Sequence, residues 1–199
     1  MNNGTRWDHN LIYHLIEANS SVLDLGCGNG ELLAKLTNEK GVSGQAVEAN
    51  PQYVAEAIRN GVAVYQKNID LGLSEFKSKS FDYVILEKTL QQLHRPLLVL
   101  EEILRIGITC IVSFPNFNYK GMVEQLLRTG RMPVTSSLPF QWYDTPNIHL
   151  FTLADFMDWA GERGIVIVEG YAVENSEPRP LKIPEDNVAA EELLLVLKS

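Results

Sequence analysis

The feature that most constrains the fold of this chain is a glycine-rich turn that joins a short apolar run to an amphipathic one. Residues 21–25 (Ser-Val-Leu-Asp-Leu) are typical of a buried strand, and the turn 26–30 (Gly-Cys-Gly-Asn-Gly) follows directly. From Glu31 onward leucines recur at helical spacing, so we expect a helix to begin at the glycines. Glycines let a ligand approach the backbone closely, and the first turn of a helix offers unpaired N–H groups. The run therefore predicts a ligand site between a strand and a helix.

The same alternation of short apolar runs and helical patterns continues along most of the chain. Continuous apolar strands that alternate with helices are typical of a parallel sheet covered on both faces. We therefore predict an α/β fold of the Rossmann-like, doubly wound type, with seven strands in its sheet. The expected strands are residues 21–25, 44–48, 63–66, 81–86, 109–114, 165–168 and 192–197, and the expected helices are residues 9–18, 31–38, 51–60, 96–106, 122–128 and 153–163. Between the last two strands we expect a loop that holds Pro178, Pro180 and Pro184.

Residues 115–150 interrupt this alternation. The segment holds five aromatic residues and four of the nine prolines, and only one short helix is expected in it. An irregular stretch of this length usually forms a lid or the wall of a binding site. We expect Phe140 and Trp142 to pack within it rather than to stack on a substrate. No composition shift or repeat marks a domain boundary, so we predict one domain over residues 1–199, with residues 115–150 as an insertion.

The charge balance excludes several classes of partner. The chain has 17 Lys and Arg residues against 25 Asp and Glu residues, a formal net charge of −8. Because nucleic-acid binding depends on clustered basic residues, we expect no nucleic-acid partner. No apolar run approaches the ~18 residues of a membrane span, and the first residues lack the apolar stretch of a signal peptide. We therefore expect a cytoplasmic protein that does not bind membranes.

The cysteines and histidines suggest neither a disulfide nor a metal site. Cys27 and Cys110 both fall in runs that are typical of buried structure, which predicts reduced and unreactive thiols. The four histidines and two cysteines lack the spacing of metal ligands. The sequence therefore predicts no bound metal.

Two kinds of ligand compete for the glycine turn. A nicotinamide or flavin site has the pattern Gly-x-Gly-x-x-Gly/Ala, but here Glu31 occupies the sixth position and the third glycine comes one residue early. Asp24 lies two residues before the first glycine, where its charge would repel a diphosphate. A carboxylate at that position suits a ligand that carries an ammonium group instead.

The arrangement strand–Asp-x-Gly-x-Gly-x-Gly–helix resembles the first motif of class I S-adenosylmethionine (SAM)-dependent methyltransferases. The resemblance implies a mostly parallel seven-stranded sheet with a C-terminal antiparallel strand. It also implies that Asp24 faces the methionyl ammonium of SAM, that Glu48 accepts the ribose hydroxyls, and that S-adenosylhomocysteine is the product of any transfer. The cofactor site implied in this way comprises Asp24, Gly26, Cys27, Gly28, Asn29, Gly30, Glu48, Ala49, Asn68, Ile69, Leu86 and Glu87, with Ala49, Asn68 and Ile69 near the adenine.

Later runs resemble a narrower family, the MetW proteins of methionine biosynthesis. The similarity is carried by residues 113–117 (Ser-Phe-Pro-Asn-Phe), 130–135 (Gly-Arg-Met-Pro-Val-Thr) and, most specifically, 138–149 (Leu-Pro-Phe-Gln-Trp-Tyr-Asp-Thr-Pro-Asn-Ile-His). Residues 89–91 (Thr-Leu-Gln) fit the same family. The resemblance implies a SAM-binding, methyltransferase-like protein in methionine biosynthesis, with homoserine O-acyltransferase as its partner.

The sequence departs from the superfamily pattern near the expected cofactor. Asn68 stands where an Asp is usual, and Glu87-Lys88 replaces a small or neutral polar pair. Candidates for a catalytic base are His94, Tyr143, His149 and Lys88. Three possibilities stay open: a SAM-binding protein that works through its partner, a methyltransferase that acts on an unidentified small molecule, and a scaffold that binds no SAM.

Overall fold

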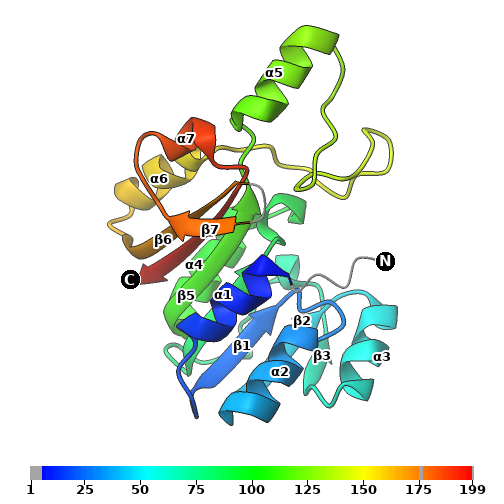
Figure 1. The fold of residues 1–199 in the computed structure, drawn as a ribbon. Coiled ribbons are helices and arrows are strands. Elements are labelled where there is room, and N and C mark those ends of the chain that lie inside the picture. The colour runs from blue at the N-terminus through cyan, green and yellow to red at the C-terminus, as the bar shows by residue number, and fades with distance from the viewer. Residues whose placement is uncertain (1–5, 175–176, 199) are drawn as a thin grey trace.

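The fold is one continuous sheet with helices on both of its faces (Figure 1). The computed structural model describes residues 6–174 and 177–198. The sheet has the spatial order β3-β2-β1-β4-β5-β8-β6-β7. Its strands are β1 Ser21–Leu25, β2 Ser43–Glu48, β3 Val64–Gln66, β4 Phe81–Glu87, β5 Gly107–Pro115, β6 Val166–Glu174, β7 Glu177–Pro180 and β8 Glu192–Lys198.

The helices follow the alternating pattern of the sequence. They are α1 Trp7–Leu15, α2 Glu31–Lys40, α3 Pro51–Arg59, α4 Pro96–Ile106, α5 Lys120–Thr129, α6 Leu153–Glu162 and α7 Asp186–Ala189, with short 3₁₀ turns at η1 Ile69–Leu71 and η2 Leu90–Gln92. Helix α6 begins with a capping box, in which Thr152 and Asp155 each satisfy a backbone N–H of the other. Among the described residues, no helix is long and apolar enough to span a bilayer.

The predicted α/β fold with a mostly parallel sheet is confirmed. Strands β3, β2, β1, β4 and β5 are parallel, and β8 lies antiparallel between β5 and β6. The predicted number of seven strands is wrong, because residues 177–180 form an eighth strand at the sheet edge. Val173 pairs with Pro178 and Tyr171 with Pro180. Proline lacks the N–H that an inner strand needs, so the proline-rich run is predicted to be a loop. An edge strand tolerates proline, and this is why the run can form a strand here.

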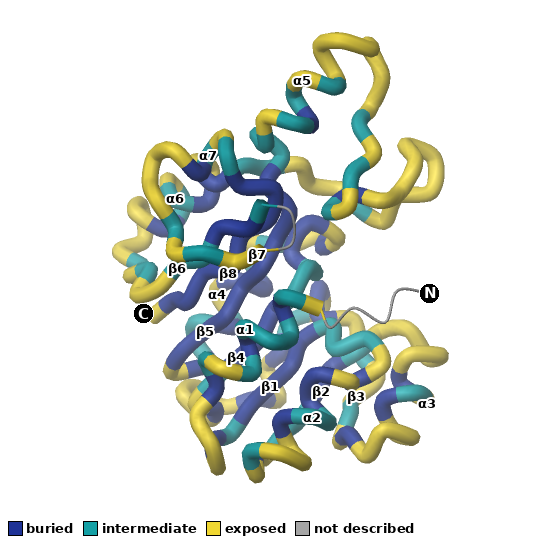
Figure 2. The backbone as a smooth tube through the Cα atoms, in the orientation of Figure 1, coloured by how far each residue is buried: buried dark blue, intermediate teal, exposed yellow. Residues whose placement is uncertain are grey.

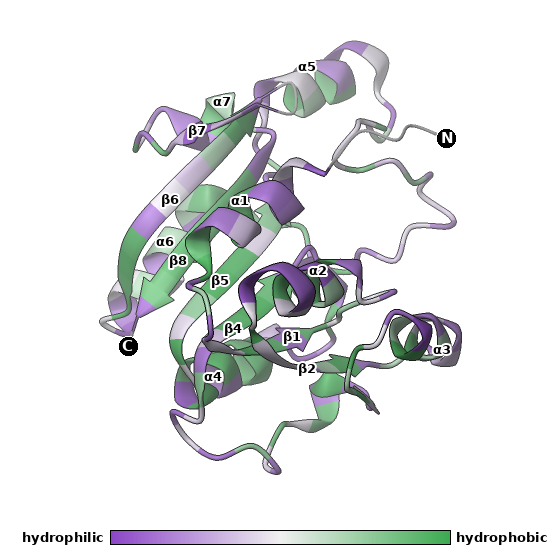
Figure 3. Cartoon of the chain, turned by 60° about the horizontal axis from the view of Figure 1, so that its bottom comes forward, coloured by the Kyte–Doolittle hydropathy of each residue, from purple (hydrophilic) through white to green (hydrophobic). Residues whose placement is uncertain are grey.

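Two apolar clusters hold the helices against the sheet. On one face α1, α2 and α3 cover the alternate strand residues that include Val22, Ala46 and Ile85. On the other face α4 and α6 cover Leu23, Val84 and their neighbours. The central strands are buried along nearly their whole length (Figure 2) and apolar (Figure 3), as expected for parallel strands covered on both sides.

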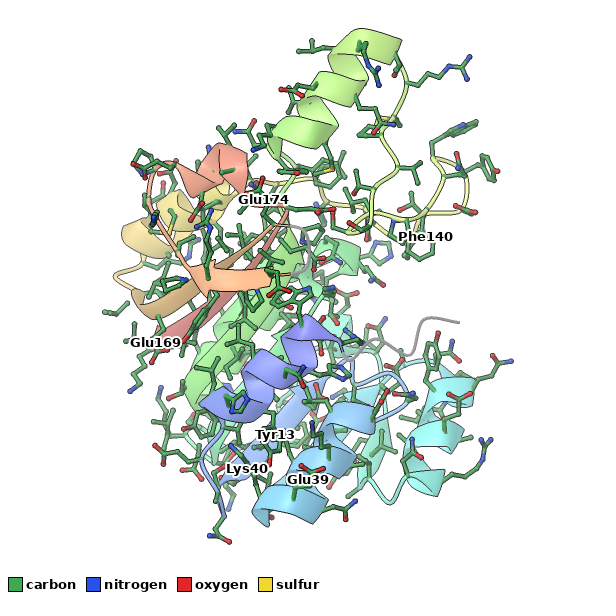
Figure 4. The ribbon with its side chains drawn as sticks, in the orientation of Figure 1. Tyr13, Glu39, Lys40, Phe140, Glu169 and Glu174 are labelled. Atoms are coloured by element: carbon green, nitrogen blue, oxygen red, sulfur yellow. The ribbon has the colours of Figure 1, made fainter. Side chains whose placement is uncertain are left out.

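Helix α1 is fastened to α2 by two lysines, Lys35 and Lys40, whose ammonium groups both lie over the Tyr13 ring. The Lys40 ammonium lies 4.5 Å from the centre of the Tyr13 ring and donates a hydrogen bond of 2.5 Å to the carbonyl of Ile16 (Figure 4). Together with the buried side chains of Ile12 and Ile16, these contacts hold α1 along the sheet. The first turn of α1, with Asp8 and His9, lies next to the carboxyl end of β4.

Residues 119–150, which we call the arm, leave the sheet after β5. The arm consists of α5 and an irregular loop, and α5 stands away from the rest of the molecule (Figure 1). Within the arm only Met122 and Leu138 are buried. The expectation that Trp142 packs is wrong: its side chain is 76% exposed, and its ring contacts that of Tyr143. No neighbouring element covers this part of the loop, so an apolar side chain there faces solvent.

The glycine turn is shaped by a close approach to the end of β4. Gly26 has φ +75°, and a Cβ atom there would lie 2.5 Å from Oγ1 of Thr89. The N–H groups of Gly26 and Cys27 both donate to the carbonyl of Val47, at 2.8 and 3.4 Å. Glycine at position 26 thus lets the turn pass between β2 and the segment that follows β4.

We expect Gly26→Ala to destabilise the protein more than Gly61→Ala does. Gly61 also has a left-handed backbone, with φ +81°, but a Cβ there would meet no atom within 4 Å. The Gly61 variant therefore isolates the backbone cost, about 1–2 kcal/mol of unfolding free energy. Urea unfolding measures both losses. Equal losses would show that Thr89 moves aside freely and that no close approach constrains position 26.

Candidate functional site

Three carboxylates meet at the carboxyl ends of neighbouring strands. Asp24 lies near the end of β1, Glu48 ends β2 and Glu87 ends β4, and β1 lies between the other two strands. The sheet order reverses between β1 and β4, which is where ligands bind in open α/β sheets. The geometry therefore places the candidate site at this edge of the sheet.

Two adjoining cavities, of about 320 and 650 Å³, open at these strand ends. They share Arg6, Gly26, Gly28, Tyr53 and Glu87, and we refer to them together as the cleft. Volumes of this size are typical of cofactor and small-molecule sites. The cleft is large enough for a nucleoside-sized ligand with space beyond it.

Asp24 is the most unusual group in the cleft. Its side chain lines the smaller cavity although the residue is only 3% exposed, and no described residue donates a hydrogen bond to its carboxylate. Burial and the nearby charges of Glu87 and Glu48 raise the pKa of Asp24 to about 8, against a smaller opposing effect of Arg6. A buried acid without a partner favours either a bound proton or a cationic ligand.

Glu48 ties the glycine turn to β2. One carboxylate oxygen accepts a hydrogen bond of 3.0 Å from the N–H of Gly28, and the other accepts one of 2.8 Å from the N–H of Asn50. Each oxygen keeps further capacity to accept hydrogen bonds from a ligand. Gly28 has φ +55°, and a Cβ there would meet no atom within 4 Å. The space in front of Gly28 is therefore open to a ligand.

The structure brings most of the predicted cofactor residues to the cleft. Those that line it are Asp24, Gly26, Cys27, Gly28, Asn29, Glu48, Ala49, Asn68, Ile69 and Glu87. Two predicted residues lie elsewhere. Gly30 lies behind the turn, where a Cβ would come within 3.0 Å of Ala57 and Val62, and Leu86 is fully buried in the core. Burial also raises the pKa of Cys27 and that of Cys110, which fits the expectation of unreactive thiols.

Asn68 and Asp70 both accept hydrogen bonds that stabilise the turn after β3 and the start of α4. The amide oxygen of Asn68 accepts a hydrogen bond of 2.9 Å from the N–H of Asp70. The Asp70 carboxylate accepts hydrogen bonds from the N–H groups of His94 and Arg95, at 3.2 and 2.7 Å, just before α4. The acid near this strand end is therefore committed to holding α4, and Asn68 presents its polar side chain to the cleft without charge.

The unexpected pair Glu87-Lys88 belongs to a partly buried ion network. Arg6 Nη2 bridges the carboxylates of Asp8 and Glu87, and Lys88 Nζ lies 3.2 Å from Asp8 and 2.6 Å from Glu192. Asp8 is fully buried; hydrogen bonds to Glu87 and Arg6 and the charge of Lys88 outweigh that burial and hold its pKa well below the ordinary value. Burial raises the pKa of Glu87. The pair is thus a junction between α1, β4 and β8.

The same network includes two residues of the cleft that the sequence did not predict. Arg6 and His9 line the cleft, and His9 Nε2 lies 3.3 Å from Glu87. No local pattern marks them, because their partners lie about 80 positions away in sequence. Asp8, His9 and Glu87 also present possible metal-ligand atoms within 4.8 Å of one another. Arg6 and Lys88 already supply the positive charge that a metal ion would bring there.

The candidate bases are separated by the fold. His94 lines the larger cavity, whereas Tyr143 is 70% exposed on the arm and His149 lines a separate apolar groove beside α4 and α6. The Lys88 ammonium is engaged by Asp8 and Glu192 and lies over the Trp7 ring. Among these four residues, His94 has the placement that a base in the cleft needs.

Comparison with known proteins decides the family. A family model described as methionine biosynthesis protein MetW matches residues 6–197. A bifunctional methionine biosynthesis protein, MetXA/MetW, from Rhodopirellula baltica is 37% identical over 171 residues, which cover 81% of this chain. The chain belongs to the MetW family. It spans 27% of the length of that bifunctional relative, so most of the relative lies outside the MetW-like region.

Solved structures with a similar fold are also known. A SAM-dependent methyltransferase from Thermotoga maritima, described as a possible histamine N-methyltransferase, has a TM-score of 0.68 and 16% identity, over 96% of this chain and 86% of that one. The cyclase SpnF has a TM-score of 0.69 and 14% identity, over 96% and 80%. At such identities the likeness concerns the fold alone, which is that of class I methyltransferases.

The pKa of Asp24 predicts an unusual dependence of stability on pH. The folded pKa of about 8 lies above the ordinary value of about 3.9, so between these pH values the folded state binds more protons than the unfolded state. Asp24 therefore lowers stability increasingly as the pH rises from about 4 to 8. We expect Asp24→Asn to be more stable than the wild type at pH 8, by at least about 1 kcal/mol, and the gain to vanish near pH 4.

Asp82 provides a control of opposite sign. Hydrogen bonds from the backbone N–H and the hydroxyl of Ser21 lower the pKa of Asp82, so this group adds stability above its unfolded pKa. Asp82→Asn should therefore be less stable than the wild type at neutral pH. Denaturant titrations at pH 4 to 8 measure both variants, and parallel pH trends would contradict the assignment for Asp24.

Proposed function

We propose that the cleft binds SAM and that the protein acts in methionine biosynthesis together with a homoserine O-acyltransferase. The observation that supports a bound SAM is the Asp24 carboxylate at the glycine turn, which is buried and accepts no hydrogen bond from the described residues. SAM contains an ammonium and a sulfonium group and no phosphate, so it complements a cleft lined by Asp24, Glu48 and Glu87. A dinucleotide would bring its diphosphate against these three acids.

The other groups of the cleft suit the remaining parts of SAM. Glu48 has two oxygens that can accept hydrogen bonds from the ribose hydroxyls, and Arg6 offers a half-exposed guanidinium to the methionyl carboxylate. Ala49, Asn68 and Ile69 give the adenine an apolar border with one polar group. SAM, when bound, supplies an electrophilic methyl group on its sulfonium. The protein residues bind and orient it.

The partner is supported by the bifunctional relative from Rhodopirellula baltica. Its name joins MetXA and MetW in one protein, and only 27% of its length matches this chain. We take the MetXA part to be the acyltransferase that acts on homoserine. Two activities that share one chain in one organism are candidates for a complex of separate chains in another.

Calorimetric titration with SAM and with S-adenosylhomocysteine tests the cofactor. We expect binding by the wild type and a loss of affinity of about 10- to 100-fold in Glu48→Gln, since a hydrogen bond to a charged group contributes about 1.5–3 kcal/mol. Glu101→Ala, an exposed acid on α4, is the matched control and should bind like the wild type. Absence of binding by folded wild-type protein would reject SAM and leave a scaffold role.

A second candidate is methyl transfer to a small acceptor. It is favoured by the larger cavity, which continues past Thr89 to Gln92, His94 and Phe140 and so leaves space beside a bound cofactor. In this case the protein forms S-adenosylhomocysteine from SAM in a small-molecule cell extract. His94→Ala should slow that formation by about 10²-fold or more if His94 takes a proton from the acceptor. Product formation no faster than in buffer would reject this candidate.

A further inference from the structure

The arm concentrates the exposed apolar side chains of the molecule. Of the nineteen large apolar side chains that are exposed among the described residues, nine lie in residues 119–150. Leu127, on α5, is 80% exposed and Trp142, in the loop, is 76% exposed, and no element of the body covers either of them. Gatherings of exposed apolar side chains on a folded protein mark interaction sites.

The arm is hydrogen-bonded to the body at both ends and in the middle, although its outer side is exposed to solvent. The N–H of Phe117 donates to the carbonyl of Phe151 at 3.2 Å, which closes the base of the arm. The hydroxyl of Ser136 donates to Glu191 at 2.6 Å, and the N–H groups of Ile148 and His149 donate to the carbonyl of Gln91, at 2.9 and 3.0 Å. The arm is therefore held in position before any partner arrives, which lowers the entropy cost of docking.

The surface of the arm has the composition of a protein–protein interface. It offers Trp142, Tyr143, Met132 and Arg131, residue types that are enriched in interfaces. Next to them an apolar hollow of about 180 Å³, lined by side chains that include Phe117, Leu138 and Ile148, can accept an apolar side chain of a partner. Phe140 lies on the side of the loop that faces the body (Figure 4) and lines both this hollow and the cleft, so the docking side is the remainder of the arm.

Charge separates the arm from the rest of the chain. The arm has three basic residues (Lys120, Arg128, Arg131) and two acidic ones (Glu124, Asp144), out of 17 and 25 in the whole sequence. All of the net negative charge thus resides outside the arm. Two copies of the chain would bring two acidic bodies together, which disfavours self-association through the arm.

We infer that the arm is the surface on which the homoserine O-acyltransferase docks. This inference rests on the proposed function, from which it takes the partner. The bifunctional relative points to that partner, because its name couples MetXA to MetW and about three quarters of its chain lies outside the MetW-like region. Leu127 and Trp142 provide the apolar anchors of this interface, and the basic residues of the arm lie at its polar rim.

The test measures binding of the purified protein to the homoserine O-acyltransferase of the same organism by calorimetry. Leu127→Asp and Trp142→Ala should each weaken binding by about tenfold or more, the effect of losing an interface anchor. Ile58→Asp is the control, because Ile58 is 59% exposed on α3, away from the arm, and it should bind like the wild type. Thermal midpoints of all variants, expected to match that of the wild type, establish that each one folds.

The outcomes separate the docking surface from the partnership. If the wild type binds and both arm variants bind equally well, the docking surface is wrong and the partnership stands. If the wild type does not bind the acyltransferase, the partnership fails and the docking surface fails with it. If the wild type forms a dimer with itself that Leu127→Asp dissociates, the arm is a self-association surface and the inference is overturned.

Discussion

The repulsion between acids at neighbouring strand ends governs how this molecule is built around its cleft. A parallel sheet brings the carboxyl ends of its strands to one edge, and here Asp24, Glu48 and Glu87 stand at three such ends. Burial strengthens the repulsion because water no longer screens it. Three features reduce this repulsion: Arg6 forms an ion pair with Glu87, backbone N–H groups donate to Glu48, and the raised pKa of Asp24 favours its protonated form.

The parts of the fold and site that could be predicted from the sequence are those that local patterns encode. The strand before Gly26 and the helix after it follow from residue spacing, and Asp24 and Glu48 follow from their positions at strand ends. The parts that could not be predicted depend on contacts between distant segments. Arg6 and His9 reach the cleft only because α1 lies beside β4, and the helical pattern of residues 9–18 gives no sign of that neighbour.

Two further differences have simple physical causes. Strand β7 was expected to be a loop because Pro178 and Pro180 lack N–H groups, and its place at the edge of the sheet removes that objection. Tyr143 and His149 stand in the most distinctive run of the sequence, and the fold puts both outside the cleft. A distinctive run therefore identifies the family although only Phe140 and Pro146 of that run line the cleft. A fold shared with a cyclase shows why the reaction must be argued from the site.

Lys88 connects segments from nearly opposite ends of the chain, since it binds Asp8 in α1 and Glu192 in β8. This has a consequence for how the protein forms during synthesis. A ribosome adds about 5–20 residues per second, so roughly a hundred residues and several seconds separate the emergence of Lys88 from that of Glu192. Until then β8 is missing from the middle of the sheet, and the ion network that holds Arg6 at the cleft is incomplete. The glycine turn is synthesised early, but the ion network beside it is completed late.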